Sequence, residues 1–237
     1  MLNNAEMNIE KRKEGEALLK IKDISLSFSQ YVSGLRQTGL KVISSLSMEA
    51  YSGEILAVVG SSGSGKSLLA HAILGILPLN AKLLGKMEYK GQELTQEKKE
   101  ELRGKEIALI PQSVNYLDPL MRISDQVIGS VDERNAELMK QTQRDIFRKY
   151  DLKPDVDRMF PHELSGGMAR RVLVSTALIN SSKLIIADEP TPGLDEKNLN
   201  ETLSYFRDMA NKGCAVILIT HDIEAALKIS DKIAIFY

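Results

Sequence analysis

The sequence has 237 residues, enough for one well-buried core with a smaller lobe attached. With 43% hydrophobic and 27% charged residues it has an ordinary globular composition, and a net charge of -1 gives no sign of a nucleic-acid-binding surface. The single cysteine, Cys214, excludes an internal disulfide and a cysteine-based metal site, as in a reducing cytosolic compartment. No apolar run approaches the roughly 18 residues that cross a bilayer, and the polar N-terminus is not a signal peptide, so we expect a soluble chain.

The first predicted elements are a flexible tail over residues 1–17 and a pair of strands. From Leu18 to Phe28 the apolar positions partly alternate, which is typical of a half-buried strand, with a slip near Asp23. The segment from Tyr31 to Leu40 contains two glycines among polar residues and predicts a loop between two early strands.

Four later segments each combine a short apolar run with polar residues directly after it. The runs are 55–59, 107–110, 184–187 and 215–219, and they lead to Gly60, to Pro111 and Gln112, to Asp188 and Glu189, and to Thr220, His221 and Asp222. Such runs favour strands buried on both faces, as in a parallel sheet covered by helices. Ligands of open parallel sheets collect beyond the carboxyl ends of the strands, so these four groups are predicted to converge on one site.

Between the second and third runs the pattern changes. Residues 124–162 are mostly polar and helical in pattern, with scattered apolar positions, and Pro154 and Pro161 mark the end of this stretch. We interpret about 113–164 as a helical insertion that forms a lobe of a single domain, 18–237. The core lobe then comprises 18–112 and 165–237.

The segment after the first buried run is a phosphate-binding loop of the form G-x-x-x-x-G-K-S. Its members, with the residue that follows them, are Gly60, Ser61, Ser62, Gly63, Ser64, Gly65, Lys66, Ser67 and Leu68. The glycines permit a tight turn whose N–H groups point at phosphate oxygens. Lys66 is expected to reach the β- and γ-phosphates of ATP and the Ser67 hydroxyl to bind Mg²⁺, while the following helix adds its positive end. A chance glycine-rich turn is the alternative, but the placement between a strand and a helix favours the nucleotide site.

The third run leads to an acidic pair. One carboxylate, Asp188, is expected to hold magnesium at the end of a neighbouring strand. The adjacent Glu189 would act as the general base that polarises the attacking water. Without the phosphate loop, a solvated pair opening a turn before Pro190 would be an equally good interpretation.

The segment Leu164-Ser165-Gly166-Gly167-Met168 resembles the signature motif of ATP-binding cassette (ABC) proteins. Six motifs of this family occur in its order, from about Leu18 onward: the phosphate loop, a Q-loop glutamine at Gln112, the signature, the acidic strand 184–189, a D-loop aspartate at Asp195 and a switch histidine at His221. The resemblance implies an α/β P-loop NTPase fold with a mainly parallel sheet, an N-terminal antiparallel portion and an inserted helical lobe.

The resemblance also implies how the site works. Ser165 would cap the helix that starts at Gly166, and Gly166 and Gly167 would let its backbone approach a phosphate. In this family the signature completes the site of a partner cassette, so that two ATP molecules lie between two subunits. Gln112 is then expected near magnesium and the attacking water, His221 at the γ-phosphate, and Phe28 or Tyr31 stacked on adenine. Either aromatic residue would otherwise be part of the core.

Two positions depart from the commoner family pattern. Met168 replaces a glutamine, although this form looks like the peptide and nickel importer branch, as does Pro161-His162-Glu163-Leu164. Pro192 and Gly193 precede Asp195 in the D-loop, where their backbone properties would affect communication between subunits rather than ATP binding. Members of this branch usually continue well past the last strand, so a C-terminal extension is expected to be missing after Tyr237.

The leading hypothesis is therefore the ATP-hydrolysing subunit of an importer for peptides, nickel or metal chelates. It would sit on the cytoplasmic face of the membrane, bound to permease subunits and to a second ABC ATPase, either a copy or a paralogue, and indirectly to a substrate-binding protein. The alternative is a soluble ABC ATPase of iron–sulfur cluster assembly. A non-hydrolysing regulatory subunit is less well supported, because Lys66, Asp188, Glu189 and His221 are all present.

Overall fold

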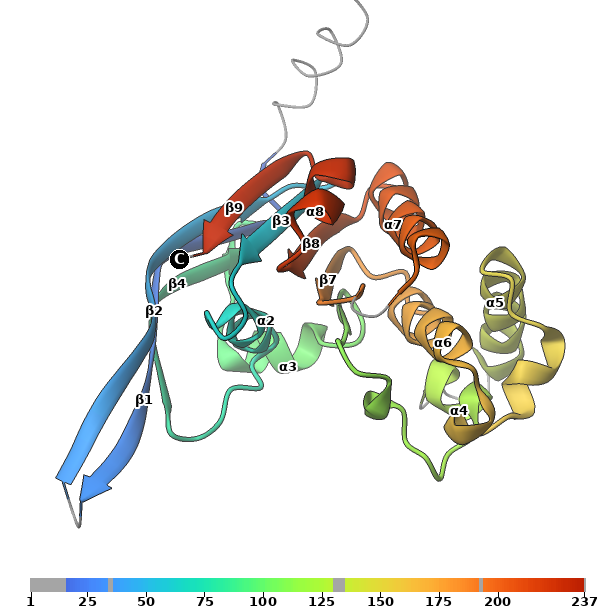
Figure 1. The fold of residues 1–237 in the computed structure, drawn as a ribbon, viewed down its shortest axis with the longest axis horizontal. Helices are drawn as coiled ribbons and strands as arrows, with labels where there is room; N and C mark the ends of the chain where they lie inside the picture. Colours follow the sequence, from blue (N-terminus) through green and yellow to red (C-terminus); the bar gives the residue numbers. More distant parts are fainter. Residues whose placement is uncertain (1–15, 34–35, 130–134, 192–193, 237) are drawn as a thin grey trace, which may run out of the picture.

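A computed structural model describes residues 16–33, 36–129, 135–191 and 194–236 (Figure 1). Most of the predicted tail, residues 1–15, lies outside the described residues. The strands form two sheets, one antiparallel and one parallel, with helices around them, as the sequence predicted. Among the described residues, no helix combines the length and the apolar character that a membrane span requires.

The antiparallel sheet contains the N-terminal strands in the order β2-β1-β4-β5. The members are β1 (Leu19–Ser33), β2 (Arg36–Ala50), β4 (Ala81–Tyr89) and β5 (Gln92–Glu93). The predicted slip near Asp23 is confirmed, because the pairing of β1 with β2 shifts register between Ile21 and Ile24, and Asp23 has φ of 50°. The Asp23 N–H donates to Ser47 Oγ at 2.9 Å, which satisfies the backbone group that the bulge leaves out of the ladder.

The prediction of a loop from Tyr31 to Leu40 is wrong. β1 and β2 stay paired through this segment, with Tyr31 opposite Gln37 and Phe28 opposite Leu40. The two strands project from the body as a long ribbon (Figure 1). Backbone hydrogen bonds hold such a ladder whatever its polarity, and Tyr31, Val32 and Thr38 have high β propensity. The polar composition was therefore a poor guide to the local structure.

The parallel sheet has the order β6-β7-β8-β3-β9. Its strands are β3 (Ile55–Gly60), β6 (Ile107–Ile110), β7 (Leu184–Asp188), β8 (Ala215–Thr220) and β9 (Lys232–Phe236), all paired in parallel. The four apolar runs of the sequence are therefore four neighbouring strands, and every residue of β7 and β8 is buried. Their carboxyl ends lie at one edge of the sheet, which positions the site.

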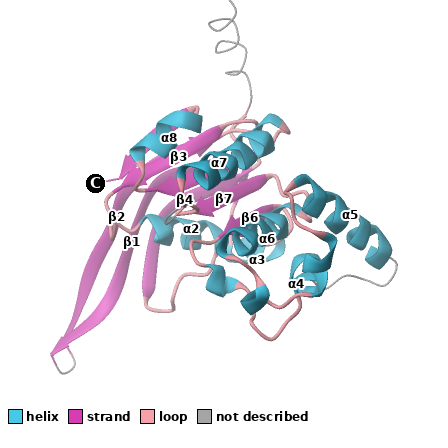
Figure 2. Ribbon diagram, turned by 45° about the vertical axis from the view of Figure 1, so that its right-hand side comes forward, coloured by secondary structure: helices cyan, strands magenta, loops and turns pink. Residues whose placement is uncertain are grey.

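Helices cover both faces of this sheet (Figure 2). They are α2 (Lys66–Leu74), α3 (Gln96–Leu102), α6 (Gly166–Leu178), α7 (Glu196–Asn211) and α8 (Ile223–Ile229). Leu69 and Ile73 of α2 belong to the apolar cluster that joins the parallel sheet to the antiparallel sheet. Phe206 and Met209 of α7 belong to a second cluster on the other face. The phosphate-loop helix is thus fixed by burial of its apolar side, not by its own propensity.

The inserted segment forms a helical lobe on the side of the molecule away from the ribbon (Figure 1). It contains α4 (Ile123–Ile128), α5 (Ala136–Lys149) and 3₁₀ turns at Val114–Tyr116, Pro154–Arg158 and Pro161–Glu163. The lobe has its own apolar cluster, but Val172 and Leu173 of α6 close that cluster while Val174 and Ala177 face the core. The two lobes therefore share α6, which starts at the signature segment.

Candidate nucleotide-binding site

The polar residues after β3, β7 and β8 meet in three contacts. The Ser67 hydroxyl donates to Asp188 Oδ1 at 3.0 Å, although 121 residues separate the two in sequence. Lys66 Nζ lies 3.9 Å from Glu189 Oε1, and His221 Nδ1 lies 2.7 Å from Glu189 Oε2. The structure therefore brings the phosphate loop, the acidic pair and the histidine together, as the parallel-sheet argument predicted.

The phosphate loop has the backbone geometry that an anion requires. Gly65 has φ of 93°, and a Cβ there would lie 2.6 Å from Val42 Cγ1, so only glycine fits. A Cβ at Gly63, whose φ is 80°, would meet none of the described residues within 4 Å, so the loop borders open space at this residue. Gly65 caps α2 without a side-chain hydrogen bond, and the buried Ser64 Oγ has no partner among the described residues. The positive end of α2, which no side chain caps, thus points to an external acceptor.

Lys66 is buried within this loop. It is 5% exposed and donates to the carbonyl oxygens of Gly60 and Ser61 at 2.8 and 2.7 Å. These two bonds hold the ammonium group over the loop, next to Glu189. A buried cation in this position provides charge-assisted hydrogen bonds for phosphate oxygens at the same edge of the sheet.

The two carboxylates of the acidic pair have different environments. Burial raises the pKa of Asp188, and the hydrogen bond from Ser67 lowers it in part. Glu189 adopts φ of 45°, which is costly for a residue with a side chain, and its N–H donates to the Ile219 carbonyl at 2.8 Å. This backbone conformation turns the Glu189 side chain away from the strand direction, toward Lys66 and His221. Strain of this kind is typical of functional residues.

The raised pKa of Asp188 has a consequence for stability. Because its folded-state pKa lies above the ordinary value of 3.8, the wild-type protein loses stability as the pH rises through the folded pKa. We expect Asp188→Asn to raise the melting temperature of the nucleotide-free protein at pH 7.5 by about 2–4 °C, the effect of about 1 kcal/mol in a chain of this size. The gain should shrink as the pH is lowered toward the ordinary aspartate range. Asp155→Asn, at an exposed aspartate, is the control, and equal melting temperatures of Asp188→Asn and wild type at pH 7.5 would refute this account of burial.

The signature residues lie at the start of α6. Ser165 Oγ accepts a hydrogen bond from the Met168 N–H at 3.3 Å, which confirms the predicted N-cap. A Cβ added at Gly166 or Gly167 would meet none of the described residues within 4 Å, so this helix end is open on the side of those two glycines. Within the described residues, no hydrogen bond or ion pair joins Ser165 to the phosphate loop of the same chain. An anion bound at this helix end would therefore not be the phosphate held by the chain's own phosphate loop.

Several predicted residues are not brought to the three-way contact. Gln112 is exposed beyond the end of β6, and its side chain makes no hydrogen bond among the described residues. Phe28 is half-buried and packs against the core cluster, while the side chain of Tyr31 and the D-loop residues Pro192 and Gly193 lie outside the described residues. Leu68 is half-buried and also packs against that core cluster.

The sequence interpretation missed two residues that shape the site. Val42 of β2 borders Gly65, and no motif signals it because the contact depends on how the antiparallel sheet packs. Arg170 of α6 donates from Nη1 to the Pro190 carbonyl, directly after the acidic pair. Its position five residues after Ser165, on the helix that the signature starts, is the one signal that could have suggested this contact.

The donor set fits a magnesium ion. Ser67 Oγ and Asp188 Oδ1 are hard oxygen ligands 3.0 Å apart, close to Lys66 at the phosphate end of the loop. Magnesium is usually held by one or two protein oxygens, with phosphate oxygens and water completing its shell. No group of three or more His, Cys, Asp or Glu side chains in the described ranges forms an independent metal site.

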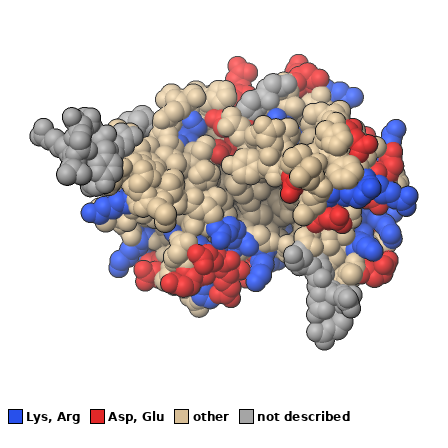
Figure 3. Space-filling view, turned by 90° about the horizontal axis from the view of Figure 1, so that it is seen from below, with Lys and Arg blue, Asp and Glu red and all other residues tan. Residues whose placement is uncertain are grey.

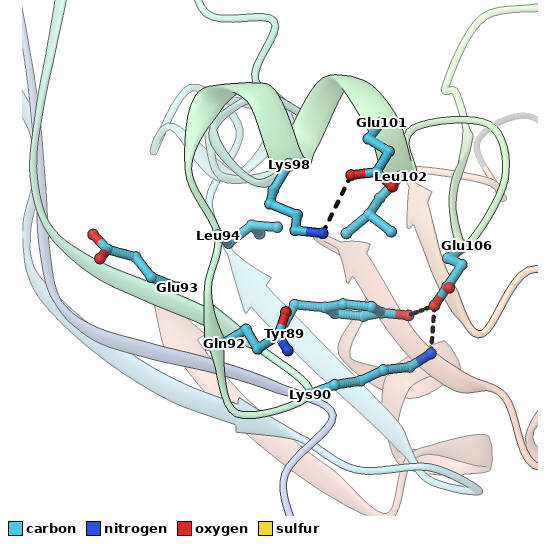
Figure 4. A pocket seen from close by; sticks show the side chains of 9 residues that line it. All are labelled: Tyr89, Lys90, Gln92, Glu93, Leu94, Lys98, Glu101, Leu102 and Glu106. Carbon is cyan, nitrogen blue, oxygen red and sulfur yellow. Dashed lines mark hydrogen bonds and ion pairs between the residues drawn. The ribbon is translucent and has the colours of Figure 1, made fainter.

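A different pocket, between β4, β5 and α3, does not fit a nucleotide. It has a volume of about 190 Å³ and is lined by residues that include Tyr89, Lys90, Lys98 and Glu106 (Figure 4). Lys90 Nζ lies 2.5 Å from Glu106 Oε2, and the Tyr89 hydroxyl donates to the same oxygen at 3.1 Å. Lys98 pairs with Glu101 in the same pocket, and none of the lining residues belongs to the phosphate loop.

The fold and the three contacts define a P-loop ATPase of the cassette class. A family model described as ABC transporter matches residues 43–192, and the chain belongs to this family as an ABC ATPase. It is 31% identical over 237 residues to the oligopeptide transport ATP-binding protein OppD of Escherichia coli (strain K12), covering 95% of this chain and 68% of the relative. It is 32% identical over 235 residues to the dipeptide transport ATP-binding protein DppD of Bacillus subtilis (strain 168), covering 94% and 68%.

A third relative is similar in sequence, and two solved structures share the fold. The oligopeptide transport ATP-binding protein AmiE of Streptococcus pneumoniae (serotype 4) is 33% identical over 238 residues, covering 95% of this chain and 65% of its own. The chain therefore spans about two thirds of the length of these relatives. A dimeric bacterial ABC transporter cassette has the same fold, with a TM-score of 0.76, 23% identity and coverage of 92% and 94%. A post-hydrolysis state of that cassette, bound to ADP and Pi, gives a TM-score of 0.75 at 23% identity, with the same coverage.

Proposed function

We propose that this chain binds and hydrolyses ATP in order to drive import of a peptide through a membrane permease. The observation that supports it most directly is the set of contacts among Ser67, Asp188, Glu189, Lys66 and His221. These residues come from three neighbouring strand ends and present a cation, two carboxylates and an imidazole at the mouth of a phosphate loop. The peptide assignment rests on the transport ATP-binding proteins to which the chain is similar.

In this proposal the loop N–H groups and Lys66 bind the β- and γ-phosphates, and Ser67 and Asp188 hold magnesium. A magnesium ion neutralises charge on phosphate oxygens that stays or grows during phosphoryl transfer. Ser67 is well placed to serve both ligands, because its hydroxyl lies between the loop and Asp188. Gln112, exposed at the adjacent strand end, would approach this ion from the side of the helical lobe.

Glu189 is the residue we assign as general base. Its carboxylate would accept a proton from the water that attacks the γ-phosphate, and this requires a fixed orientation. His221 at 2.7 Å and Lys66 at 3.9 Å engage its two oxygens separately, and so define that orientation. His221 is half-exposed and can also donate to the γ-phosphate as negative charge redistributes. The strained backbone position at Glu189, directly after β7, supports a role that depends on this geometry.

We infer that a second cassette completes each site. The helix end at Ser165, Gly166 and Gly167 is capped, exposed and open to an anion, yet nothing in the described residues connects it to the chain's own phosphate loop. Two chains placed head to tail would set each signature against the other's γ-phosphate. ATP would then be bound more tightly by the closed dimer than by the open form, and this difference in affinity is what performs mechanical work.

Coupling to the permease would involve the segment after Gln112. Tyr116, Leu120 and Met121 are 62%, 88% and 42% exposed on the way into the helical lobe. Three large apolar side chains exposed within six residues of the chain are typical of a surface that binds another protein. On the face shown in Figure 3, acidic and basic side chains both occur, and no extended basic stripe is visible on that face. We propose that this segment contacts permease subunits at the cytoplasmic face of the membrane.

Co-purification tests the transport role. The tagged chain, expressed in cells that carry its own gene neighbourhood, should be recovered with integral membrane proteins, and the complex should hydrolyse ATP with magnesium. Recovery with soluble iron–sulfur scaffold proteins instead would favour the cluster-assembly alternative. Absence of ATP turnover, both alone and with the permease, would refute the proposed function.

A further inference from the structure

A cavity of about 330 Å³ lies at the opposite edge of the parallel sheet from the phosphate loop. We call it the α5–β8 cavity. It is lined by Ser182 and Lys183, which precede β7, by Cys214, which precedes β8, and by residues of the last turns of α5, α6 and α7. Because β7 has five residues, the two edges of the sheet are about 16 Å apart. The cavity is therefore separate from the nucleotide site.

The floor of the cavity is apolar. Ile146, Tyr150, Leu178 and Met209 contribute to its lining, and Tyr150 is held by an edge-to-face contact with Tyr205 at 4.4 Å between ring centroids. Burial raises the pKa of the Cys214 thiol, which therefore stays protonated and donates to the Ser182 carbonyl at 3.2 Å. The volume of the cavity, about 330 Å³, falls at the small end of the range of ligand sites in proteins.

The mouth of the cavity carries an excess of positive charge. Lys149, Lys183 and Lys212 line it, and none of the described residues that line it is acidic. Lys149 is neutralised by Asp208 on α7, with 3.0 Å between Nζ and Oδ2. Lys183 and Lys212 make no ion pair among the described residues, and contact with the Lys149 side chain lowers the pKa of Lys212. The described part of the mouth thus has three ammonium groups but one ion pair, and Asp208, which forms it with Lys149, also acts on Lys212 from farther away.

Helix ends account for only part of this arrangement. Lys149 lies in the last turn of α5 and Lys212 directly after α7, where the carbonyl dipoles of a helix end stabilise a cation. Lys183 immediately precedes a strand and has no such helix end of its own. The dipoles also give no reason for an open apolar floor beside the three ammonium groups. Together the features match a ligand with an acidic head and an apolar body.

We propose that the α5–β8 cavity binds an amphipathic anion, with one carboxylate or phosphate group held by Lys183 and Lys212 and an apolar chain or ring on the floor. At about 30 Å³ per non-hydrogen atom, the cavity accommodates about ten such atoms. The ligand would contact α5 of the helical lobe and the amino ends of β7 and β8 at once. The site does not depend on ATP, and its test can be made without nucleotide.

Calorimetric titration of the nucleotide-free protein tests this site with three probes: octanoate, octyl phosphate and 1-octanol. We expect one of the two anions to bind with a stoichiometry of one and a dissociation constant on the order of 0.1 mM. The double variant Lys183→Glu, Lys212→Glu should weaken it at least tenfold. Thr142→Trp, which places an indole on α5 at the cavity lining, should do the same without changing charge.

The matched control is the double variant Lys98→Glu, Lys140→Glu, which makes the same change in net charge at exposed lysines outside the cavity. It should bind the anion with wild-type affinity, and circular dichroism should report the same melting temperature for all variants within a few degrees. Equal binding of 1-octanol and the anions would overturn the proposal, as would unchanged affinity in the Lys183→Glu, Lys212→Glu variant or an equal loss in the control.

Discussion

Glu189→Gln is expected to lower the rate of ATP hydrolysis about a thousandfold while leaving nucleotide affinity nearly unchanged. Loss of a positioned general base typically costs between a hundredfold and ten-thousandfold. The amide keeps the size of the carboxylate and can still contact His221 and Lys66, so the site should stay assembled with ATP bound. Single-turnover kinetics and equilibrium binding of a fluorescent ATP analogue measure the two quantities separately.

The control for this variant is Glu224→Gln. Glu224 is an exposed acid in the first turn of α8, three residues after His221, so the change in charge is the same and lies close to the site. We expect wild-type turnover. A Glu189→Gln variant that hydrolyses ATP at the wild-type rate would remove Glu189 from the role of base.

Lys66→Ala is expected to weaken ATP binding at least about a hundredfold. The ammonium group would make charge-assisted hydrogen bonds to two phosphates, and their loss removes about 3 kcal/mol. In the protein itself Lys66 also donates to the Gly60 and Ser61 carbonyls, so the variant loses two loop contacts as well. Titration with ATP and magnesium measures the loss, and hydrogen exchange of the loop amides reports any loosening.

Lys99→Ala is the matched control for Lys66→Ala. Lys99 is another buried lysine, 7% exposed on α3, and burial lowers its pKa. The Lys99→Ala variant tests whether the loss of a buried lysine away from the phosphate loop also weakens ATP binding. We expect wild-type affinity. Equal loss of ATP affinity in the two variants would mean that the effect comes from altered stability rather than from phosphate contacts.

The strand ends of the site were predictable because two signals in the sequence indicate each of them. A uniformly apolar run such as 184–187 indicates a strand buried on both faces, and the residues that follow it carry the chemistry. Knowing that such strands lie parallel is enough to gather Asp188, Glu189 and His221 beside the phosphate loop. The slip at Asp23 was predictable for a similar reason, since a break in the alternation of apolar residues leaves a visible mark.

Other features were not predictable, because they arise from tertiary packing. The backbone conformation of Glu189 follows from its hydrogen bond to Ile219, and no residue type announces it. The contact of Arg170 with Pro190 depends on how α6 lies against the sheet. The ribbon through Tyr31 was missed because backbone pairing stabilises polar strands, for which a hydrophobic pattern gives no signal.

The most direct test of the account is the molecular mass of the Glu189→Gln variant in solution with saturating ATP and magnesium. If the phosphate loop is half a site that another chain completes, sedimentation equilibrium with ATP should give twice the monomer mass of 26.3 kDa. Without ATP it should give the monomer mass. Adding Gly167→Asp should abolish the dimer while leaving ATP binding intact, because a Cβ there meets no described residue within 4 Å. A monomer at every ATP concentration, or a dimer unaffected by Gly167→Asp, would contradict the account.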